Sequence, residues 1–263
     1  MQIYTHTLPG GAQLIGYLRD RTVEMPAFNT RPAILILPGG GYAWCSKREA
    51  DPVAMQFLQA GYNVFTLYYT CRSDETVPAL RWQPLIDAAG AILHIRRNAE
   101  QFGTDPAKIA ICGFSAGGHL ALSGAVLDIP GETAQQRPNA VILGYPVVTA
   151  GEFAHRGSFV RLAGSEDAAA QQGFTLEDQV NSDTPPVFVW HTMEDKTVPV
   201  ENTLLLLAAL RRAGVPCEAH LFEKGAHGTS ISTAEVDAAD RHRARWVTLC
   251  LEWLGRTFGF DLR

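Results

Sequence analysis

A serine flanked by glycines follows an apolar run near the middle of the chain. The motif Gly113-Phe114-Ser115-Ala116-Gly117 comes directly after the strand-like run 108–112 and before the helix-forming run 119–122. A strand, a G-x-S-x-G motif and a helix in this order are typical of a nucleophile elbow, whose sharp turn exposes the serine hydroxyl. The glycines let neighbouring segments approach closely, and the helix N-terminus favours a developing anion. We therefore predict that Ser115 is a nucleophile; a glycine-rich turn with a capping serine is the alternative.

A serine hydroxyl needs a base, and the base needs a third group that orients it. Asp195 lies in the loop after the apolar run 186–191, and His227 lies in the loop after the run 217–222. This chain order, serine then acid then histidine, is the order of the architecture in which such elbows occur. We predict that Asp195 orients His227, and that His227 serves first as general base and then as general acid.

Other acids and histidines compete for these two roles. Glu194 is a rival acid that would point elsewhere in an extended loop, and Glu201 is expected to open the next helix. His119 is four residues past Ser115 on the predicted helix, which favours a packing role. His191 lies near the site at a strand end, but no glycine hinge follows it.

A run of three glycines follows the first buried strand and predicts an oxyanion-binding loop. Gly39, Gly40 and Gly41 come directly after Pro38, where the apolar run 33–37 stops. In hydrolases of this design the residue after the nucleophile and a glycine-rich loop supply N–H groups to the oxyanion. We assign these donors to Ala116, Gly40 and Gly41. A tight turn or a phosphate cradle is the alternative, but no phosphate-loop or dinucleotide motif is present.

The sequence gives no support for a metal or cofactor. It contains no HxH, HExxH or CxxC motif. The five widely spaced cysteines are typical of reduced, mostly buried thiols in a cytoplasmic protein. They are Cys45, Cys71, Cys112, Cys217 and Cys250.

The elements that must position these residues alternate between strands and helices. Predicted buried strands cover 33–37, 63–69, 108–112, 140–143, 187–190 and 217–222. Two runs separated by Pro9-Gly10-Gly11 predict an antiparallel hairpin at the N-terminus. Predicted helices cover 51–61, 83–102, 200–213 and 240–254. This alternation predicts one α/β domain over 1–263, with a mostly parallel twisted sheet of about eight strands and helices on both faces.

Residues 146–185 interrupt the alternation. This stretch is polar, rich in alanine and glycine, and has no strong strand pattern. We expect an insert over the strand ends that forms a small cap or lid; a plain excursion without a role in the site is the alternative.

Composition and charge exclude several classes of protein. The chain has 263 residues, 46% hydrophobic, and a net charge of −5 with a pI near 5.9. It has no long basic run, which argues against a nucleic-acid partner. The longest strongly apolar run, 204–210, is much shorter than the about 20 residues that span a membrane. The N-terminus has no secretory pattern, so we expect a cytoplasmic protein.

These motifs together resemble the α/β-hydrolase superfamily over nearly the whole chain. Within it, the pattern is similar to small bacterial esterases of the acetyl-xylan-esterase-like group, related to the hormone-sensitive-lipase-like esterases. The segments that carry the resemblance are 38–42, 113–119, 190–195 with 198–199, and 225–228. One departure concerns Pro38, because the lipase-like relatives have a histidine at this position; the backbone donors do not depend on it.

The resemblance implies a serine carboxylesterase that hydrolyses short-acyl esters, acetyl esters of carbohydrates among them, through an acyl-enzyme. Tyr42, Trp44 and Tyr145 are candidates to line the substrate pocket, although aromatic residues near loops are as often core residues. The partner expected is a small-molecule ester, and the exposed insert offers a surface for a homo-oligomer.

Other functions would use the same serine, histidine and aspartate. An arylformamidase-like amidase or a small serine peptidase of the oligopeptidase type would employ the same three side chains. Such peptidases usually carry a further domain, for which this chain has no room. A hydrolase-fold protein that binds without catalysis is a third alternative, but such proteins normally lack one of the three residues.

Overall fold

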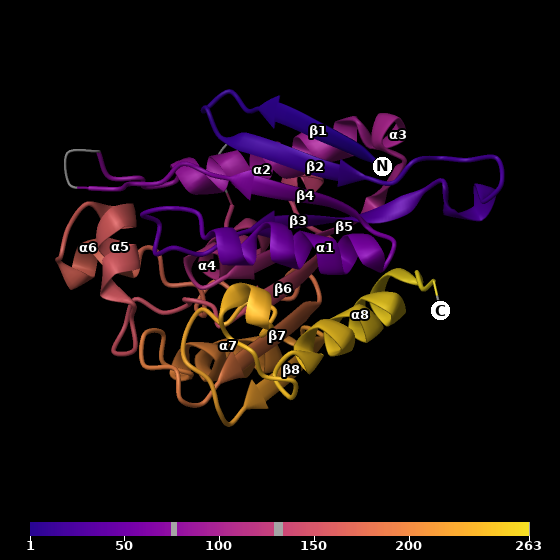
Figure 1. Cartoon of the computed structure of the whole chain (residues 1–263). Coiled ribbons are helices and arrows are strands. Elements are labelled where there is room, and N and C mark those ends of the chain that lie inside the picture. Colours follow the sequence, from indigo (N-terminus) through magenta and orange to yellow (C-terminus); the bar gives the residue numbers. More distant parts are fainter. Residues whose placement is uncertain (75–77, 129–133, 263) are drawn as a thin grey trace.

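The computed structural model describes residues 1–74, 78–128 and 134–262. An eight-stranded sheet with the order β1-β2-β4-β3-β5-β6-β7-β8 runs through the molecule (Figure 1). The strands are β1 (Gln2–Thr7), β2 (Gln13–Leu18), β3 (Arg31–Leu37), β4 (Asn63–Tyr68), β5 (Thr104–Phe114), β6 (Ala140–Gly144), β7 (Val187–Thr192) and β8 (Cys217–Phe222). Strands β3 to β8 are parallel, whereas β1 and β2 pair antiparallel at one edge. The predicted α/β-hydrolase sheet and its N-terminal hairpin are therefore confirmed.

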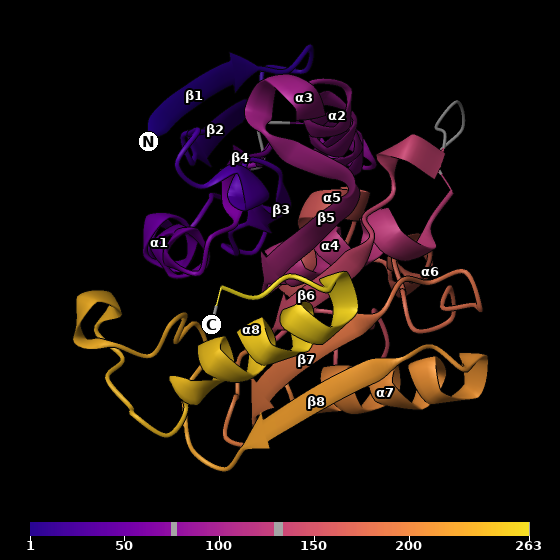
Figure 2. The same ribbon diagram turned by 90° about the vertical axis from the view of Figure 1, so that its right-hand side faces the viewer.

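Helices cover both faces of this sheet. They are α1 (Asp51–Gln59), α2 (Gln83–Arg97), α3 (Ala99–Phe102), α4 (Ala116–Val126), α5 (Arg156–Ala163), α6 (Ala168–Gln172), α7 (Glu201–Ala213) and α8 (Arg245–Phe258). Helices α2, α4 and α7 lie on one face of the sheet, and α1 and α8 lie on the opposite face (Figure 2). The apolar side chains of the first group belong to one core, and those of the second group belong to another.

The central strands are apolar along their whole length because each face of the sheet is covered. In β3, Leu35 belongs to the core under α2, α4 and α7, whereas Ile34 and Ile36 belong to the core under α1 and α8. All three side chains are fully buried. This two-sided burial explains why the sequence shows continuous apolar runs and no alternation.

Two of the predicted helices differ most from their expected bounds. The predicted helix 83–102 is divided into α2 and α3 near Asn98, whose side-chain amide donates to the His94 carbonyl. The last helix, α8, begins at Arg245 and not at Asp240. The Asp240 carboxylate accepts the Arg243 N–H, and the buried Arg243 guanidinium donates to the Lys224 and Ala238 carbonyls. These contacts hold the chain in an irregular loop between β8 and α8.

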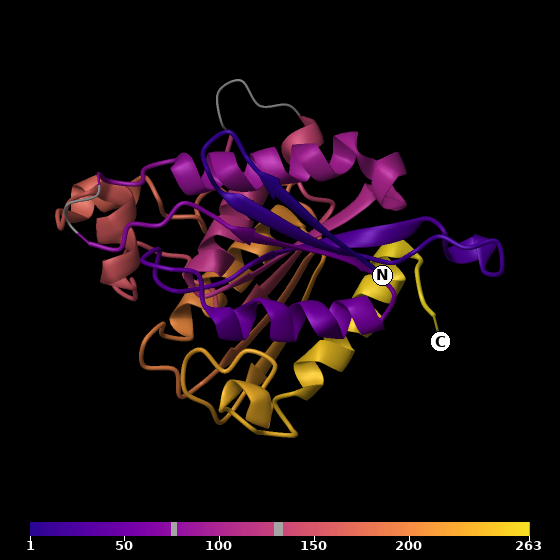
Figure 3. The same cartoon turned by 45° about the horizontal axis from the view of Figure 1, so that its top comes forward.

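The stretch between β6 and β7 lies at the end of the sheet where the parallel strands terminate. It contains α5 and α6, which Figures 1 and 3 show grouped at this end of the molecule. Phe159 and Leu162 of α5 are buried against the main core. The predicted insert 146–185 is thus packed onto the same domain and does not form a body of its own.

Candidate active site

Ser115 occupies a strained turn between β5 and α4. Its backbone angles are φ 54° and ψ −120°, a left-handed conformation that residues other than glycine rarely adopt. The turn is held by the Ser115 N–H, which donates to the Gly144 carbonyl at 3.0 Å. Strain of this kind persists only where the surroundings fix it, and it is concentrated at functional sites.

The glycines on either side of Ser115 are required by close backbone contacts. A Cβ atom on Gly113 would lie 2.1 Å from the Gly117 carbonyl oxygen. A Cβ atom on Gly117 would lie 2.1 Å from the Leu37 carbonyl oxygen at the end of β3. The elbow can therefore form only where both positions lack a side chain.

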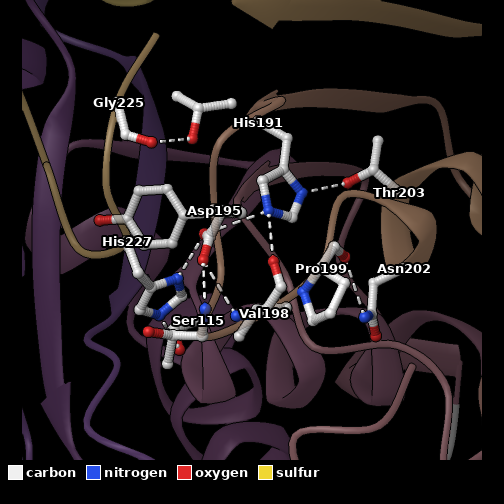
Figure 4. A network of polar contacts seen from close by, with 12 residues as sticks. Ser115, His191, Asp195, Val198, Pro199, Asn202, Thr203, Gly225 and His227 are labelled. Atoms are coloured by element: carbon white, nitrogen blue, oxygen red, sulfur yellow. Dashed lines mark hydrogen bonds and ion pairs between the residues drawn. The ribbon is translucent and has the colours of Figure 1, made fainter. Parts of the chain in front are cut away.

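The structure brings Ser115, His227 and Asp195 into one hydrogen-bonded line (Figure 4). The Ser115 hydroxyl lies 2.8 Å from His227 Nε2. On the other side of the ring, His227 Nδ1 lies 2.6 Å from Asp195 Oδ2. The three residues come from loops after β5, β8 and β7, which end at the same edge of the sheet.

Asp195 is buried and remains ionised because several donors surround it. Its Oδ1 atom accepts the N–H groups of Thr197 and Val198, each at 2.9 Å. Burial alone would raise the pKa of Asp195, but the hydrogen bonds from His191 and His227, the His227 charge and the Val198 N–H together hold it well below its usual value. The neighbouring Glu194 is excluded from this role by position, because its exposed carboxylate pairs with Lys224.

His191 is a second histidine on Asp195, a contact that the sequence analysis did not predict. Its fully buried ring places Nε2 3.0 Å from the Val198 carbonyl and 3.2 Å from Asp195 Oδ2. Its Nδ1 atom lies 2.8 Å from Thr203 Oγ1 on α7 (Figure 4). His191 thus contacts the same carboxylate oxygen of Asp195 as His227 does. The only sequence signal for this contact is its place at the end of β7, four residues before Asp195.

The glycine loop after β3 presents two N–H groups beside Ser115. The Gly39 N–H is engaged, because it donates to Glu49 Oε2 at 2.7 Å. Within the described ranges, no hydrogen bond is formed by the N–H groups of Gly40 and Gly41, and both residues line the cavity at Ser115. Gly40 has φ 128°, and a Cβ atom there would lie 2.1 Å from the Trp44 carbonyl oxygen. This geometry removes Gly39 from the possible donors and leaves Gly40, Gly41 and Ala116.

Glu49 is a buried carboxylate of the site that the sequence analysis missed. It is 3% exposed and accepts a hydrogen bond from the Tyr145 hydroxyl at 2.6 Å in addition to that from Gly39. Burial raises the pKa of Glu49, and its hydrogen bonds and the nearby His227 only partly offset that effect. No motif marks this residue, because its importance depends on how two loops meet in space.

A cavity of about 350 Å³ opens onto Ser115 and His227. Its walls come from the glycine loop 39–41, which we call the oxyanion loop after its predicted role, from the short 3-10 turn Lys47–Glu49, and from the inserted helix α5. The residues from these walls are Gly40, Gly41, Trp44, Ser46, Arg48, Glu49, His155, Gly157 and Arg161. The insert therefore contributes a wall of the site.

The three aromatic residues predicted to line the pocket are placed differently by the structure. Trp44 is at the cavity and is 62% exposed. Tyr42 and Tyr145 are each 1% exposed and are absent from the cavity wall. Their hydroxyl groups point into the protein, toward His119 Nδ1 at 2.8 Å and toward Glu49. The assignment of these two tyrosines to the pocket is corrected accordingly.

His119 has the packing role that its position on the helix suggests. Its Nδ1 atom accepts from Tyr42, and its Nε2–H donates to the Phe174 carbonyl at 2.8 Å. Burial lowers the pKa of His119 to about 4, which keeps the ring neutral. It thereby joins the oxyanion loop and α4 to the insert.

Three further features of the described residues bear on the class of site. No group of three or more His, Cys, Asp or Glu side chains in the described part of the chain is arranged to hold a metal ion. None of the helices in the same ranges is both long enough and apolar enough to cross a bilayer. The five cysteines are free thiols.

Known proteins resemble this chain in sequence and in fold. Residues 23–141 match the BD-FAE family model, and residues 91–259 match that of the prolyl oligopeptidase family. The chain therefore belongs to the α/β-hydrolase superfamily. Its structural relatives of matching length include a carboxylesterase.

Three relatives illustrate this similarity. An acetyl ester-xyloside bifunctional hydrolase from Caldicellulosiruptor lactoaceticus is 34% identical, with a TM-score of 0.81 over 97% of this chain and 90% of that one. The carboxylesterase Cest-2923 from Lactobacillus plantarum WCFS1 is 26% identical, with a TM-score of 0.88 over the full length of both chains. An acetylxylan esterase of Xylanibacter ruminicola is 30% identical over 85% of this chain and 45% of its own length. The chain spans less than half of the length of the first curated relatives it matches.

Proposed function

We propose that this protein is a serine carboxylesterase that removes short acyl groups, acetyl groups above all, from carbohydrate esters. The observation that carries the proposal is the line from Ser115 Oγ through His227 to Asp195 at the floor of an open cavity. A nucleophile, a base and an orienting carboxylate within hydrogen-bond reach are what acyl transfer through a covalent intermediate requires.

The proposed reaction has two halves. Ser115 Oγ attacks the ester carbonyl while His227 Nε2 takes its proton, and the ionised Asp195 stabilises the resulting imidazolium. His227 then gives the proton to the alcohol oxygen as the ester bond breaks, which leaves an acyl group on Ser115. Water, activated by His227, attacks this acyl-enzyme and releases the acid.

The negative charge that develops on the carbonyl oxygen needs donors already in place. The N–H groups of Ala116, Gly40 and Gly41 are the candidates, since Ala116 begins α4 and the two glycines face the cavity. Loss of one such donor typically reduces transition-state stabilisation by about 3–4 kcal/mol.

Two observations favour a carbohydrate acetyl ester as substrate. Trp44 presents a large exposed aromatic surface at the cavity, a suitable platform for a sugar ring. The similar proteins include an acetylxylan esterase and an acetyl ester-xyloside hydrolase. The match to the prolyl oligopeptidase family model keeps an amide substrate as the second candidate.

Hydrolysis of p-nitrophenyl esters from acetate to octanoate tests this proposal. We expect acetate to be turned over fastest and Ser115→Ala to reduce kcat by roughly four or more orders of magnitude. Ser123→Ala is a matched control, because Ser123 lies on α4, the helix that follows Ser115, is buried and donates to the His119 carbonyl outside the cavity. Inactivity of the wild type toward every ester, with turnover of formamide or aminoacyl substrates, would favour the amidase or peptidase instead.

A further inference from the structure

Two arginines stand on different walls of the cavity at Ser115. Arg48 belongs to the turn Lys47–Glu49, and Arg161 belongs to the inserted helix α5. A Cβ atom on Gly228 would lie 3.4 Å from Arg48 Nη2, which places this guanidinium beside the residue that follows His227. Arg161 Nη1 donates to the Gly157 carbonyl at 2.9 Å, at the same wall.

Neither guanidinium is neutralised by an ion pair with a carboxylate in the described part of the chain. Glu49 is the acidic group nearest to Arg48 in sequence, but both of its oxygens accept hydrogen bonds from Gly39 and Tyr145. The wall at Arg161 carries His155, whose Nδ1 atom lies 2.8 Å from Ser158 Oγ. Burial lowers the pKa of His155, so the positive charge at the cavity comes from the two guanidiniums, and no carboxylate of the described residues forms an ion pair with either.

This accumulation of positive charge is local. The chain as a whole has 27 acidic and 22 basic residues, so unpaired arginines do not follow from its composition. Arg243 and Arg256, elsewhere in the fold, do pair with carboxylates, those of Asp240 and Glu218. Two guanidiniums facing an open cavity are what recognition of an anion requires, because each offers a planar fork of donors that matches a carboxylate or a phosphate.

We propose that the cavity binds an ester whose alcohol part carries an anionic group, held between Arg48 and Arg161. This proposal rests on the proposed function, because it assigns the two arginines to the leaving group of that reaction. The assignment follows from position: His227 must protonate the alcohol oxygen, and Arg48 lies beside Gly228, next to that histidine. With Trp44 at the same opening, the substrate class is an acetylated carbohydrate that bears a carboxylate or a phosphate.

A pair of acetyl esters that differ only in charge tests the subsite. The probes are 4-acetoxybenzoate and its neutral isostere 4-acetoxybenzamide. For each ester, kcat/KM is divided by the rate constant of its hydrolysis by hydroxide. The measured quantity is the ratio of this normalised value for the benzoate to that for the benzamide. For the wild type we expect this ratio to be about tenfold or more, since a hydrogen bond to a charged group typically contributes a factor of this order. A third probe, 4-acetoxyphenyl phosphate, shows which anion is preferred, and preference for either anion over the amide supports the subsite.

The variants Arg48→Gln and Arg161→Gln should each reduce the ratio by about tenfold, mainly through KM for the charged ester. Lys47→Gln is the matched control. It removes the same charge one residue from Arg48, but Lys47 lies over the Tyr68 ring and outside the cavity. The ratio in this control should stay within about twofold of the wild type, because Lys47 does not line the cavity and its charge reaches the ester only through solvent, which screens it.

Two results would overturn the proposal while leaving the esterase intact. One is a ratio near one in the wild type that neither arginine variant changes, although both esters are still cleaved and the cleavage needs Ser115. The other is an equal fall of this ratio in Lys47→Gln, which would show that the charged ester is favoured by the overall positive potential of this surface and not by a specific subsite. If no ester is cleaved at all, the proposed function itself has failed, and this outcome differs from both of the others.

Discussion

The hydroxyl of Tyr145 donates a hydrogen bond to the carboxylate of Glu49 at 2.6 Å, and this contact joins three loops of the site. Glu49 also accepts the Gly39 N–H of the oxyanion loop. Tyr145 in turn accepts the Ser230 N–H at 3.0 Å, and its ring packs edge-on against His227 at 4.9 Å. The two side chains therefore fix the oxyanion loop relative to the loop that carries the base.

Removal of this hydroxyl should weaken the fold. In Tyr145→Phe the ring against His227 is kept, but the Glu49 carboxyl and the Ser230 N–H each lose a buried partner. We expect the free energy of unfolding at pH 7 to fall by about 1–3 kcal/mol in urea titrations. The loss should shrink as the pH falls, because the raised pKa of Glu49 favours its neutral form and a neutral carboxyl depends less on the donor. Tyr68→Phe is the control, and an equal loss there would contradict the role of the Glu49 contact.

The acid partner of His227 can be tested by two neighbouring substitutions. Asp195→Asn places an NH₂ group or a weaker acceptor against donors that now bind a carboxylate, so the orientation and charge balance of His227 are lost. We expect kcat for p-nitrophenyl acetate to fall by roughly three to four orders of magnitude. Glu194→Gln, one residue away and at the surface, should change kcat by less than about twofold. A large loss in the second variant and a small one in the first would reverse the assignment.

The elbow predicts opposite effects for two glycine-to-alanine substitutions. In Gly117→Ala the new methyl group meets the Leu37 and Pro38 carbonyls at 2.1 and 2.5 Å, so α4 must move away from the oxyanion loop. We expect a loss of at least ~2 kcal/mol in stability together with a large loss of activity. At Gly90 in α2 a Cβ atom meets nothing within 4 Å, so Gly90→Ala should stabilise the protein by about 0.5–1 kcal/mol. Thermal unfolding of both variants measures this difference in stability. Equal unfolding midpoints for the two variants would contradict the prediction.

The buried His119 predicts a loss of stability in mild acid. Its pKa is about 4 in the folded protein and about 6.5 when unfolded, so in this window the unfolded chain binds a proton that the native protein excludes. The contribution is complete above pH 6.5 and declines as the pH falls, by about 2 kcal/mol between pH 7.5 and pH 5. In urea unfolding at the two pH values, the loss of stability should be the same in the wild type and in His242→Gln, and smaller by about 2 kcal/mol in His119→Gln. An unchanged difference in His119→Gln would assign the acid sensitivity to other groups.

The parts of the site that follow from strand order could be predicted from the sequence. Parallel strands end at one edge, so loops after β5, β7 and β8 had to bring Ser115, Asp195 and His227 near one another. The catalytic roles of the three residues remain the proposal made above. The glycine pattern likewise indicated the close contacts that the backbone makes at Gly113 and Gly117.

The parts that depend on contacts between loops could not be predicted. Tyr42 and Tyr145 have φ values of 63° and 38°, turns that carry no periodic signal, and their side chains are directed inward. Glu49 looks like an ordinary acid on a charged turn until the oxyanion loop is folded against it. His191 lies on a strand that is buried on both faces, so the pattern of apolar residues does not distinguish it from a packing residue.

The contact between Ser115 and His227 joins residues 112 positions apart, and β8 is the last strand to be synthesised. A chain that has formed its central strands and most of its helices but has not paired β8 with β7 has Ser115 in its turn without His227 beside it. Contacts of such long sequence separation form late, because the entropy lost in closing the intervening loop must be offset first. Under the proposed function, esterase turnover would report the completion of folding, and during refolding it should recover after the helical signal has returned.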